Sequence, residues 1–380
     1  MLGRITRVLT TALLAGALLA ACSSKKGQLI ERTIPAPSLG ENVFQEPTEQ
    51  PVVVYLPPSY ASTDKRYPVV YLLPGFRTDV KAFVDGTYQG YSLQASMDSL
   101  INKRAVTEMI VVVANGRNFL GGSFYANSPI TGNWEDFIVQ DVVRYVDENY
   151  KTIARADARG ITGHSMGGTG ALNIAMRHPD VFCAVYAMSP GLFDRTGMRA
   201  QGMFAPSAMV NPTVDKIRAL AAMPREQAHQ DFVEFIRGLY ASGSTQAEEW
   251  AFSFAYGAAF SPDRRSNAPY LLYPYATGTG GGISVNMTAF TNYDAGYGSS
   301  EIKIREYRDN LLKLDAIAID VGLADRFRWI PDGCKYFKKG LDEAGVTNEL
   351  ITFNGGHSDR LRERIEKHMV PFFSKVLASE

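Results

Sequence analysis

Residues 158–176 read ARGITGHSMGGTGALNIAM and hold a GxSxG motif centred on Ser165. The residues before the motif, 158–162, predict a short buried strand, and the small residues after it lead into a segment with helical spacing. A turn of this kind between a strand and a helix is so tight that only glycine fits around the serine, which is held in a strained conformation. The stretch therefore predicts a nucleophile elbow, in which Ser165 protrudes at the end of a strand.

Strand-like and helix-like segments alternate on both sides of the motif. Runs of β-branched or aromatic residues predict strands, and runs with a 3.6-residue period predict helices. The strands are expected at 51–56, 67–73, 108–114, 181–188, 314–320 and 348–353, and the helices at 93–103, 134–149, 329–343 and 360–376. Repeated β–α units build a parallel sheet covered by helices, so the sequence predicts an α/β fold with a mostly parallel central sheet flanked by helices.

Residues 192–310 break this alternation. They contain alanine-rich helical stretches, a glycine-rich run at 278–282 and many aromatic residues. An insertion at this point, before the last two strands, predicts a cap or lid over the carboxyl edge of the sheet. Aromatic side chains at such density pack a core more often than they line a ligand site, so most of them are expected to hold the insertion together.

The first 22 residues differ from the rest of the chain. Arg4 and Arg7 precede a short apolar run at 8–20, and small residues then lead to Cys22. This pattern resembles the export signal and lipobox of bacterial lipoproteins. The resemblance implies a signal peptide at 1–21, acylation of Cys22 as the first mature residue, and anchoring in a membrane. An ordinary signal peptide cut nearby, with an incidental cysteine, is the alternative.

The segment after Cys22 lacks the composition of a packed element. Residues 22–45 are rich in Ser, Lys, Gly and Pro and poor in large apolar residues, which predicts a lipidated flexible tether. The catalytic domain is then expected over 46–380. Ser23 and Ser24 stand where an aspartate would resemble the inner-membrane retention signal of enteric bacteria. The resemblance therefore implies an exported lipoprotein of the outer membrane, on its periplasmic or cell-surface face.

Charge and cysteine content argue against several classes of protein. The 39 basic and 39 acidic residues give a net charge of zero, whereas a nucleic-acid partner would require a basic surface. Beyond the N-terminal segment, Cys183 and Cys334 are expected to be small buried hydrophobes rather than a disulfide. The sequence holds no cysteine–histidine cluster, no HExxH motif and no phosphate-binding loop, so neither a metal nor a cofactor is expected.

A nucleophilic serine needs two further groups. A base must take the hydroxyl proton, and an acid must fix the tautomer of that base. Of the five histidines, His357 lies in a glycine loop directly after the last predicted strand, where such a base must sit. The acid should follow the preceding strand, which offers Asp320 and Asp325. The position of Asp325 in the loop favours it, and Asp320, at the end of the strand, stays open as an alternative.

Five segments together resemble one family of enzymes. They are YLLPG at 71–75, GNWEDF at 132–137, GHSMGG at 163–168, DVGLAD at 320–325 and GGH at 355–357. The family is an esterase family that includes S-formylglutathione hydrolases, feruloyl and acetylxylan esterases, enterochelin esterases and mycolyltransferases. The resemblance covers about 45–191 and 312–378. It implies the α/β-hydrolase fold, with 192–310 as a cap insertion before the strand that leads to the acid.

The resemblance also implies roles for single residues. The second aspartate of the D-x-G-x-x-D pattern completes the family's triad, which implies that Asp325 is the acid. An oxyanion hole needs two preorganised N–H donors aimed at the developing negative charge. Met166, the residue after the nucleophile, is expected to supply one donor. By the resemblance, the backbone N–H of Phe76 supplies the other.

A long loop at 118–133 is expected at the carboxyl edge of the sheet, beside the predicted nucleophile. Arg77 and Trp134 are expected to line the substrate pocket together with this loop. Phe124 and Tyr125, within the loop, would suit an aromatic or sugar-linked acyl ester. These four residues are the candidates for the wall of the pocket.

The sequence therefore predicts a serine ester hydrolase that works through an acyl-enzyme intermediate. Its expected substrate is a small-molecule or glycan ester, namely an acylated carbohydrate or a phenolic ester of the feruloyl or acetyl type. Three alternatives stay open. The protein could be an acyltransferase of the mycolyltransferase type, a peptidase on the same fold, or a lipoprotein that binds without catalysis.

Overall fold

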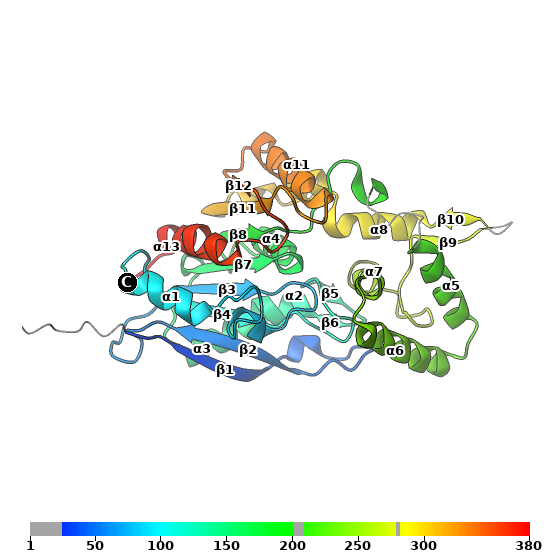
Figure 1. The fold of residues 1–380 in the computed structure, drawn as a ribbon, viewed down its shortest axis with the longest axis horizontal. Helices are drawn as coiled ribbons and strands as arrows, with labels where there is room; N and C mark the ends of the chain where they lie inside the picture. The colour runs from blue at the N-terminus through cyan, green and yellow to red at the C-terminus, as the bar shows by residue number, and fades with distance from the viewer. Residues whose placement is uncertain (1–24, 201–208, 279–281) are drawn as a thin grey trace, which may run out of the picture.

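The computed structural model describes residues 25–200, 209–278 and 282–380. Its centre is an eight-stranded sheet in the order β1-β2-β4-β3-β7-β8-β11-β12 (Figure 1). The strands are β1 Gln28–Pro35, β2 Glu49–Leu56, β3 Val69–Leu73, β4 Ile110–Ala114, β7 Arg159–His164, β8 Ala184–Met188, β11 Ala316–Gly322 and β12 Glu349–Phe353. The pairings from β4 through β12 are parallel, whereas β2 pairs antiparallel with both β1 and β4. The mostly parallel α/β sheet predicted from the sequence is confirmed.

Helices cover both faces of this sheet, and the alternation of side chains along each strand explains why. In β3, Tyr71 and Leu73 point into one buried core while Val70 and Leu72 point into the other. The first core is covered by α4 Met166–Arg177, α11 Trp329–Glu343 and the helical segment 134–149. The second is covered by α1 Leu93–Asn102 and α13 Val370–Val376. Because both faces are buried, the strands read as continuous apolar runs.

The helix predicted over 134–149 is present, but it is not regular. It consists of α2 Trp134–Asp136, a π-helical turn Phe137–Val142 and α3 Val143–Asn149. A second π-helical turn, Ile365–Met369, joins α12 Leu361–Arg364 to α13. A π turn inserts one residue into the hydrogen-bonding pattern, so it changes which side chains face the core. Hydrophobic spacing alone does not reveal such an insertion.

The prediction of a flexible tether over 22–45 is wrong for most of that segment. Residues Gln28–Pro35 form β1, which pairs along its whole length with β2, and a short 3-10 helix follows at Pro37–Leu39. The side chains of β1 show almost no hydrophobic pattern, because Ile34 is fully buried while its neighbours Thr33 and Pro35 are exposed. An edge strand needs few buried side chains because its backbone hydrogen bonds hold it to the sheet. The predicted signal peptide and Cys22 lie outside the described residues.

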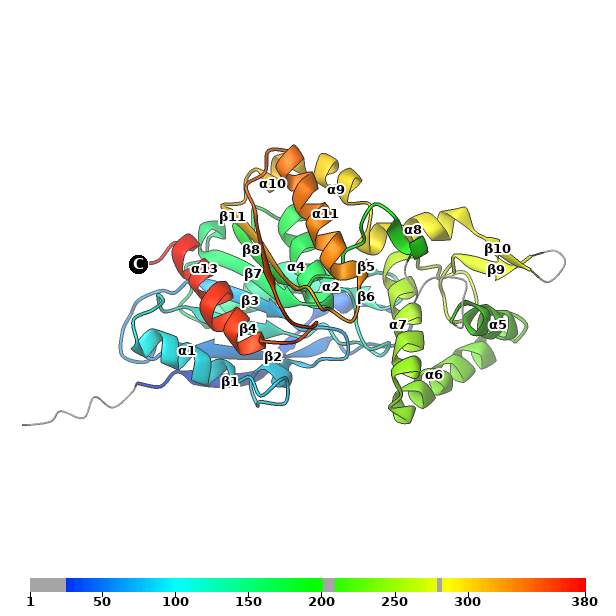
Figure 2. The same ribbon diagram turned by 45° about the horizontal axis from the view of Figure 1, so that its top comes forward.

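The segment predicted as a cap, 192–310, is mostly helical. It contains α5 Val210–Ala221, α6 Arg225–Ser242, α7 Thr245–Phe260, α8 Met287–Tyr297, α9 Ser300–Glu306 and α10 Arg308–Leu311, with a hairpin of β9 Tyr275–Thr277 and β10 Ile283–Val285. Figure 2 shows α5 to α8 and the hairpin projecting from one side of the sheet, whereas α9 and α10 lie with α11 in the helical layer. Phe232, Phe254 and Tyr256 of the projecting helices belong to the same buried core as the sheet.

The parallel strands bring four chain segments to one edge. The segments that follow β3, β7, β11 and β12 all leave the sheet at its carboxyl edge, because parallel strands end on the same side. Ser165, Asp325 and His357 lie in three of these segments, and Phe76 lies in the fourth. No helix in the part of the chain that the structure describes is both long and apolar enough to cross a membrane.

The structure predicts that β1 contributes to the stability of the domain. We expect Ile34→Ala to lower the free energy of unfolding by about 2–4 kcal/mol, because it removes a fully buried side chain from the core. Thr33→Ala, at the exposed neighbouring position, should change it by less than about 0.5 kcal/mol. Urea unfolding of both variants measures the difference. Equal values for the two would mean that this segment is not part of the folded sheet.

Candidate active site

Ser165 occupies a sharp turn between β7 and α4. Its backbone adopts φ 58° and ψ −117°, which is a costly conformation for a residue with a side chain. Two glycines make the turn possible. A Cβ on Gly163 would lie 2.3 Å from the carbonyl oxygen of Gly167, and a Cβ on Gly167 would lie 1.9 Å from that of Leu73. The elbow therefore accepts no side chain at either position, and Ser165 lines the adjoining pocket.

His357 and Asp325 meet at the same edge of the sheet. His357 Nδ1 lies 2.6 Å from Asp325 Oδ2, and the Asp325 side chain is fully buried. The other carboxylate oxygen, Oδ1, accepts a 2.8 Å hydrogen bond from the backbone N–H of Phe327. The carboxylate thus holds a proton on Nδ1 and leaves Nε2 free to act as a base. In this structure Ser165 Oγ and His357 Nε2 line one pocket but do not form a hydrogen bond.

Asp320, the alternative acid, has other partners. It lies inside β11 and is fully buried, and its Oδ1 accepts hydrogen bonds from Arg364 Nε at 3.1 Å and Arg364 Nη2 at 2.6 Å. The hydroxyl of Tyr186 donates to Oδ2 at 3.0 Å. The structure therefore brings Asp325, and not Asp320, into contact with His357.

The backbone carbonyl of His357 is a convergence point for hydrogen bonds. It accepts from His164 Nε2 at 2.9 Å, from Arg364 Nη1 at 3.1 Å and from Ser189 Oγ at 3.3 Å. Arg364 also donates to Ser189 Oγ at 2.9 Å. These bonds fix the loop that carries the imidazole. Arg364 and Ser189 were not predicted, because a single arginine on a helix and a serine after a strand carry no local signal of such a role.

His164, within the GxSxG motif, is part of this network. Because its Nε2 donates to a carbonyl, its Nδ1 is the acceptor, and the hydroxyl of Tyr88 lies 2.9 Å from it. Ser358 Oγ in turn lies 3.0 Å from the Tyr88 hydroxyl. Burial, followed by the charges of His357 and Arg364, holds the pKa of His164 well below its ordinary value. His164 is therefore a neutral structural imidazole beside the nucleophile.

The predicted oxyanion donors belong to two backbone segments that adjoin Ser165. Met166 is the first residue of α4, where a backbone N–H has no acceptor within the helix. Gly75 approaches the elbow so closely that a Cβ on it would lie 3.5 Å from Ser165 Cβ, and Phe76 follows directly. The N–H of Phe76 makes no hydrogen bond within the part of the chain that the structure describes, whereas the next residue, Arg77, donates to Gly121 at 2.8 Å.

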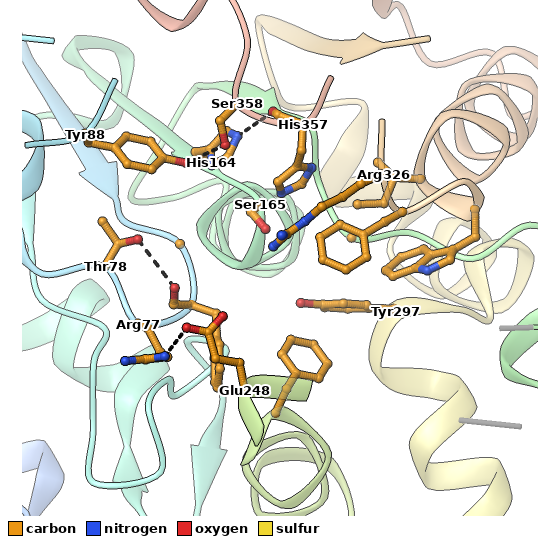
Figure 3. A pocket seen from close by; sticks show the side chains of 17 residues that line it. Arg77, Thr78, Tyr88, His164, Ser165, Glu248, Tyr297, Arg326, His357 and Ser358 are labelled. Carbon is orange, nitrogen blue, oxygen red and sulfur yellow. Dashed lines mark hydrogen bonds and ion pairs between the residues drawn. The ribbon is translucent and has the colours of Figure 1, made fainter. Parts of the chain in front are cut away.

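These groups surround a pocket of about 390 Å³ (Figure 3). Six aromatic residues are among those that line it, namely Phe76, Tyr88, Phe252, Tyr297, Phe327 and Trp329. Three charged side chains besides the triad also line it, namely Arg77, Glu248 and Arg326. Phe252 and Glu248 come from α7 and Tyr297 from the end of α8, so the projecting helices supply one side of the pocket. None of these cap residues was predicted individually.

Of the four residues predicted to line the pocket, only Arg77 does so, and it forms an ion pair with Glu248. The prediction for the other three is wrong. Trp134 is fully buried and donates its indole N–H to the Thr131 carbonyl, and Tyr125 is buried with its hydroxyl on the Pro74 carbonyl. Phe124 lies behind the wall, with its ring 5.2 Å from that of Phe252. All three support the pocket from inside the core.

The fold and this site together define an α/β-hydrolase. The family described as “Putative esterase” matches residues 46–237, which is more than half of the chain. The protein therefore belongs to this esterase family. The family resemblance found in the sequence is confirmed.

Two relatives share part of the sequence. An esterase of Mycobacterium tuberculosis is 28% identical over 143 residues, which cover 36% of this chain and 28% of the relative. An S-formylglutathione hydrolase of Arabidopsis thaliana is 28% identical over 144 residues, which cover 36% of this chain and 50% of the relative. The matched region thus spans half or less of the length of either relative.

Solved structures share the fold over almost the whole chain. A ferulic acid esterase superposes with a TM-score of 0.57 at 20% identity, covering 93% of this chain and 99% of that one. An S-formylglutathione hydrolase from Agrobacterium tumefaciens superposes with a TM-score of 0.54 at 15% identity, covering 94% and 98%. At these identities the likeness establishes the fold.

The elbow predicts a severe effect for Gly167→Ala. The added Cβ would overlap the backbone carbonyl of Leu73, which cannot rotate away, so we expect a loss of about 3 kcal/mol or more in the free energy of unfolding. Gly238→Ala in α6 is the control, because nothing lies within 4 Å of its Cβ position. Alanine there should be neutral or stabilise the helix by up to about 1 kcal/mol. Urea unfolding measures both, and similar destabilisation would contradict this view of the elbow.

The network predicts that His164 stays neutral over the pH range in which a free imidazole takes up a proton, with its own proton on Nε2. The unfolded chain takes up a proton on this histidine below its ordinary pKa of 6.5, while the folded chain does not. Stability should therefore fall as the pH drops below that value. ¹⁵N NMR of histidine-labelled protein, assigned with His164→Gln, reports the tautomer. A protonation shift of the His164 signal in this range would overturn the prediction.

Proposed function

We propose that this protein is a serine carboxylic-ester hydrolase in which Ser165 is the nucleophile, His357 the base and Asp325 the orienting acid. The observation that carries the proposal is the 2.6 Å contact of His357 Nδ1 with a fully buried carboxylate, beside a pocket that Ser165 also lines. Membership of the esterase family and the esterase among the relatives support it.

The reaction starts when His357 Nε2 removes the proton of Ser165 Oγ. The oxygen attacks the ester carbonyl, whose π electrons move onto the carbonyl oxygen. When this tetrahedral intermediate collapses, the C–O bond to the alcohol breaks and His357 returns the proton to the departing alcohol. Water then attacks the acyl-enzyme with the same base, and the acid product leaves as Ser165 regains its proton.

Asp325 and two backbone N–H groups support these steps. Asp325 stabilises the imidazolium that forms when His357 holds the extra proton, and it keeps Nε2 directed at the pocket. The N–H groups of Phe76 and Met166 are positioned to donate to the oxyanion. Because both donors are part of the backbone beside the elbow, they need no reorganisation when charge develops.

The pocket supports a substrate with a flat or ring-shaped group. Six aromatic rings contribute to its wall, and aromatic rings in a pocket bind aromatic acyl groups and the apolar faces of sugars. We propose that the substrate is an acylated carbohydrate or a phenolic ester. Solved neighbours with the same fold include a ferulic acid esterase and an S-formylglutathione hydrolase.

We also propose that the protein is exported and anchored in the outer membrane through acylated Cys22. This part of the proposal rests on the sequence of residues 1–24 alone. Metabolic labelling with a fatty-acid analogue tests it, because Cys22→Ser should abolish incorporation of the label. Labelled protein in the Cys22→Ser variant would refute lipidation at this residue.

The catalytic proposal is tested with p-nitrophenyl esters from acetate to laurate and with methyl ferulate. We expect Ser165→Ala to lower kcat/KM by at least about a thousandfold, and Asp325→Asn by a similar order, because the triad acts as a unit. A fluorophosphonate probe should label wild type at Ser165, as read by mass spectrometry. The length of the preferred acyl chain reports the depth of the pocket.

Asp332→Asn is the matched control for Asp325→Asn. Asp332 is an exposed residue of α11 whose side chain pairs with Lys335 and does not line the pocket, so its loss should leave kcat/KM unchanged. Full activity of Ser165→Ala would disprove the assignment of the nucleophile. Faster acyl-enzyme turnover with added glycerol or sugar would instead show that an alcohol replaces water as the acceptor.

A further inference from the structure

The charged residues of the pocket are not all neutralised. Arg77 and Glu248 both line the pocket and form an ion pair with each other, which cancels their charges. Arg77 is also held over the ring of Tyr240, with its Cζ 4.8 Å from the ring centroid. The Arg77 guanidinium thus joins the segment after β3 to the projecting helices α6 and α7, and it is not available to a ligand.

The carboxylate nearest in sequence to Arg326 is also occupied. Both oxygens of Asp325 are used, one by His357 Nδ1 and one by the N–H of Phe327. Asp359, in the loop of His357, accepts from the Gly356 backbone. Within the described residues, Arg326 forms no ion pair, and its guanidinium lies over the ring of Phe327 with its Cζ 4.6 Å from the centroid.

Arg326 therefore places one uncompensated positive charge in the pocket. Figure 3 shows its side chain extending from the loop after β11 towards Ser165 and His357. The stacking on Phe327 restrains the side chain without using its N–H donors, so these donors stay available. Arg326 is an exposed residue, so solvent reaches the guanidinium and a charge interaction there is sensitive to salt.

We infer that Arg326 is a specificity-determining residue that binds an anionic oxygen group of the substrate, so that the enzyme prefers esters carrying a carboxylate to neutral esters. The inference rests on the proposed ester hydrolysis at Ser165 and narrows its substrate class. A guanidinium presents two parallel N–H donors that match the two oxygens of a carboxylate. The Arg77–Glu248 pair contributes no net charge, so Arg326 is, within the described residues, the arginine of the pocket wall that is left without an ion-pair partner.

Two matched substrate pairs test this inference, one for each side of the scissile bond. 4-Acetoxybenzoate is compared with 4-acetoxybenzamide, and mono-4-nitrophenyl adipate with its terminal amide. In wild type we expect a higher kcat/KM for the charged member of at least one pair. Arg326→Gln should reduce the ratio of kcat/KM for the charged ester to kcat/KM for the neutral ester by about fivefold, mainly through KM, because a single exposed charge interaction contributes about 1 kcal/mol.

Arg328→Gln is the matched control. Arg328 is an exposed arginine two residues further along the same loop, and it does not line the pocket. Its substitution should leave both ratios as in wild type. Raising the ionic strength from about 0.02 M to about 0.5 M should weaken the preference for the charged ester in wild type, because salt screens the interaction.

The outcomes separate this inference from the proposed function. If wild type hydrolyses the neutral esters but shows no preference in either pair, the inferred preference for anionic esters is wrong, while the proposed ester hydrolysis is unaffected. The same conclusion follows if Arg326→Gln lowers kcat/KM equally for the charged and the neutral esters. If Ser165→Ala retains activity or wild type cleaves no ester at all, the proposed function itself fails.

Discussion

The buried ion pair between Arg364 and Asp320 is the interaction on which the site depends. One edge of the Arg364 guanidinium donates to the Asp320 carboxylate, and its other N–H groups donate to the His357 carbonyl and to Ser189 Oγ. It thereby joins the strand before the acid, the loop of the base and the strand next to the elbow. Removing one partner of such a pair costs about 3–5 kcal/mol, because the other charge stays buried. The network positions His357 without touching the reacting atoms.

Much of the fold was predictable because its signals are local. The parallel strands are continuous apolar runs, and Gly163 of the elbow is required by a contact with Gly167, four residues along the chain. The loop positions of Asp325 and His357 followed from the order of the strands. β1 was missed because an edge strand with one fully buried side chain has almost no hydrophobic pattern. Its place in the sheet comes from backbone pairing with β2, which composition does not reveal.

The wall of the pocket was the least predictable part. Trp134 and Tyr125 were expected there because they are aromatic and near the right edge, but buried carbonyls satisfy their polar atoms inside the core. The residues that do line the pocket come from segments far apart in the chain, as Glu248 of α7 and Arg77 after β3 illustrate. Such a meeting depends on how the projecting helices pack, which no short sequence pattern encodes. Arg326 and Ser358 adjoin the predicted triad and were within reach of local reasoning.

The direction of β1 has a consequence for how an anchored enzyme would face its surroundings. β1 runs antiparallel to β2, and β2 antiparallel to β4, so Gln28 lies at the amino edge of the sheet. Only six peptide links separate Gln28 from Cys22, so the two residues can be at most about 20 Å apart. With Cys22 in a bilayer, the amino edge would rest near the lipid headgroups and the catalytic edge would open away from them. Such an orientation favours substrates that are dissolved or attached to a polymer and reach the site from the aqueous side. It disfavours esters embedded in the same leaflet.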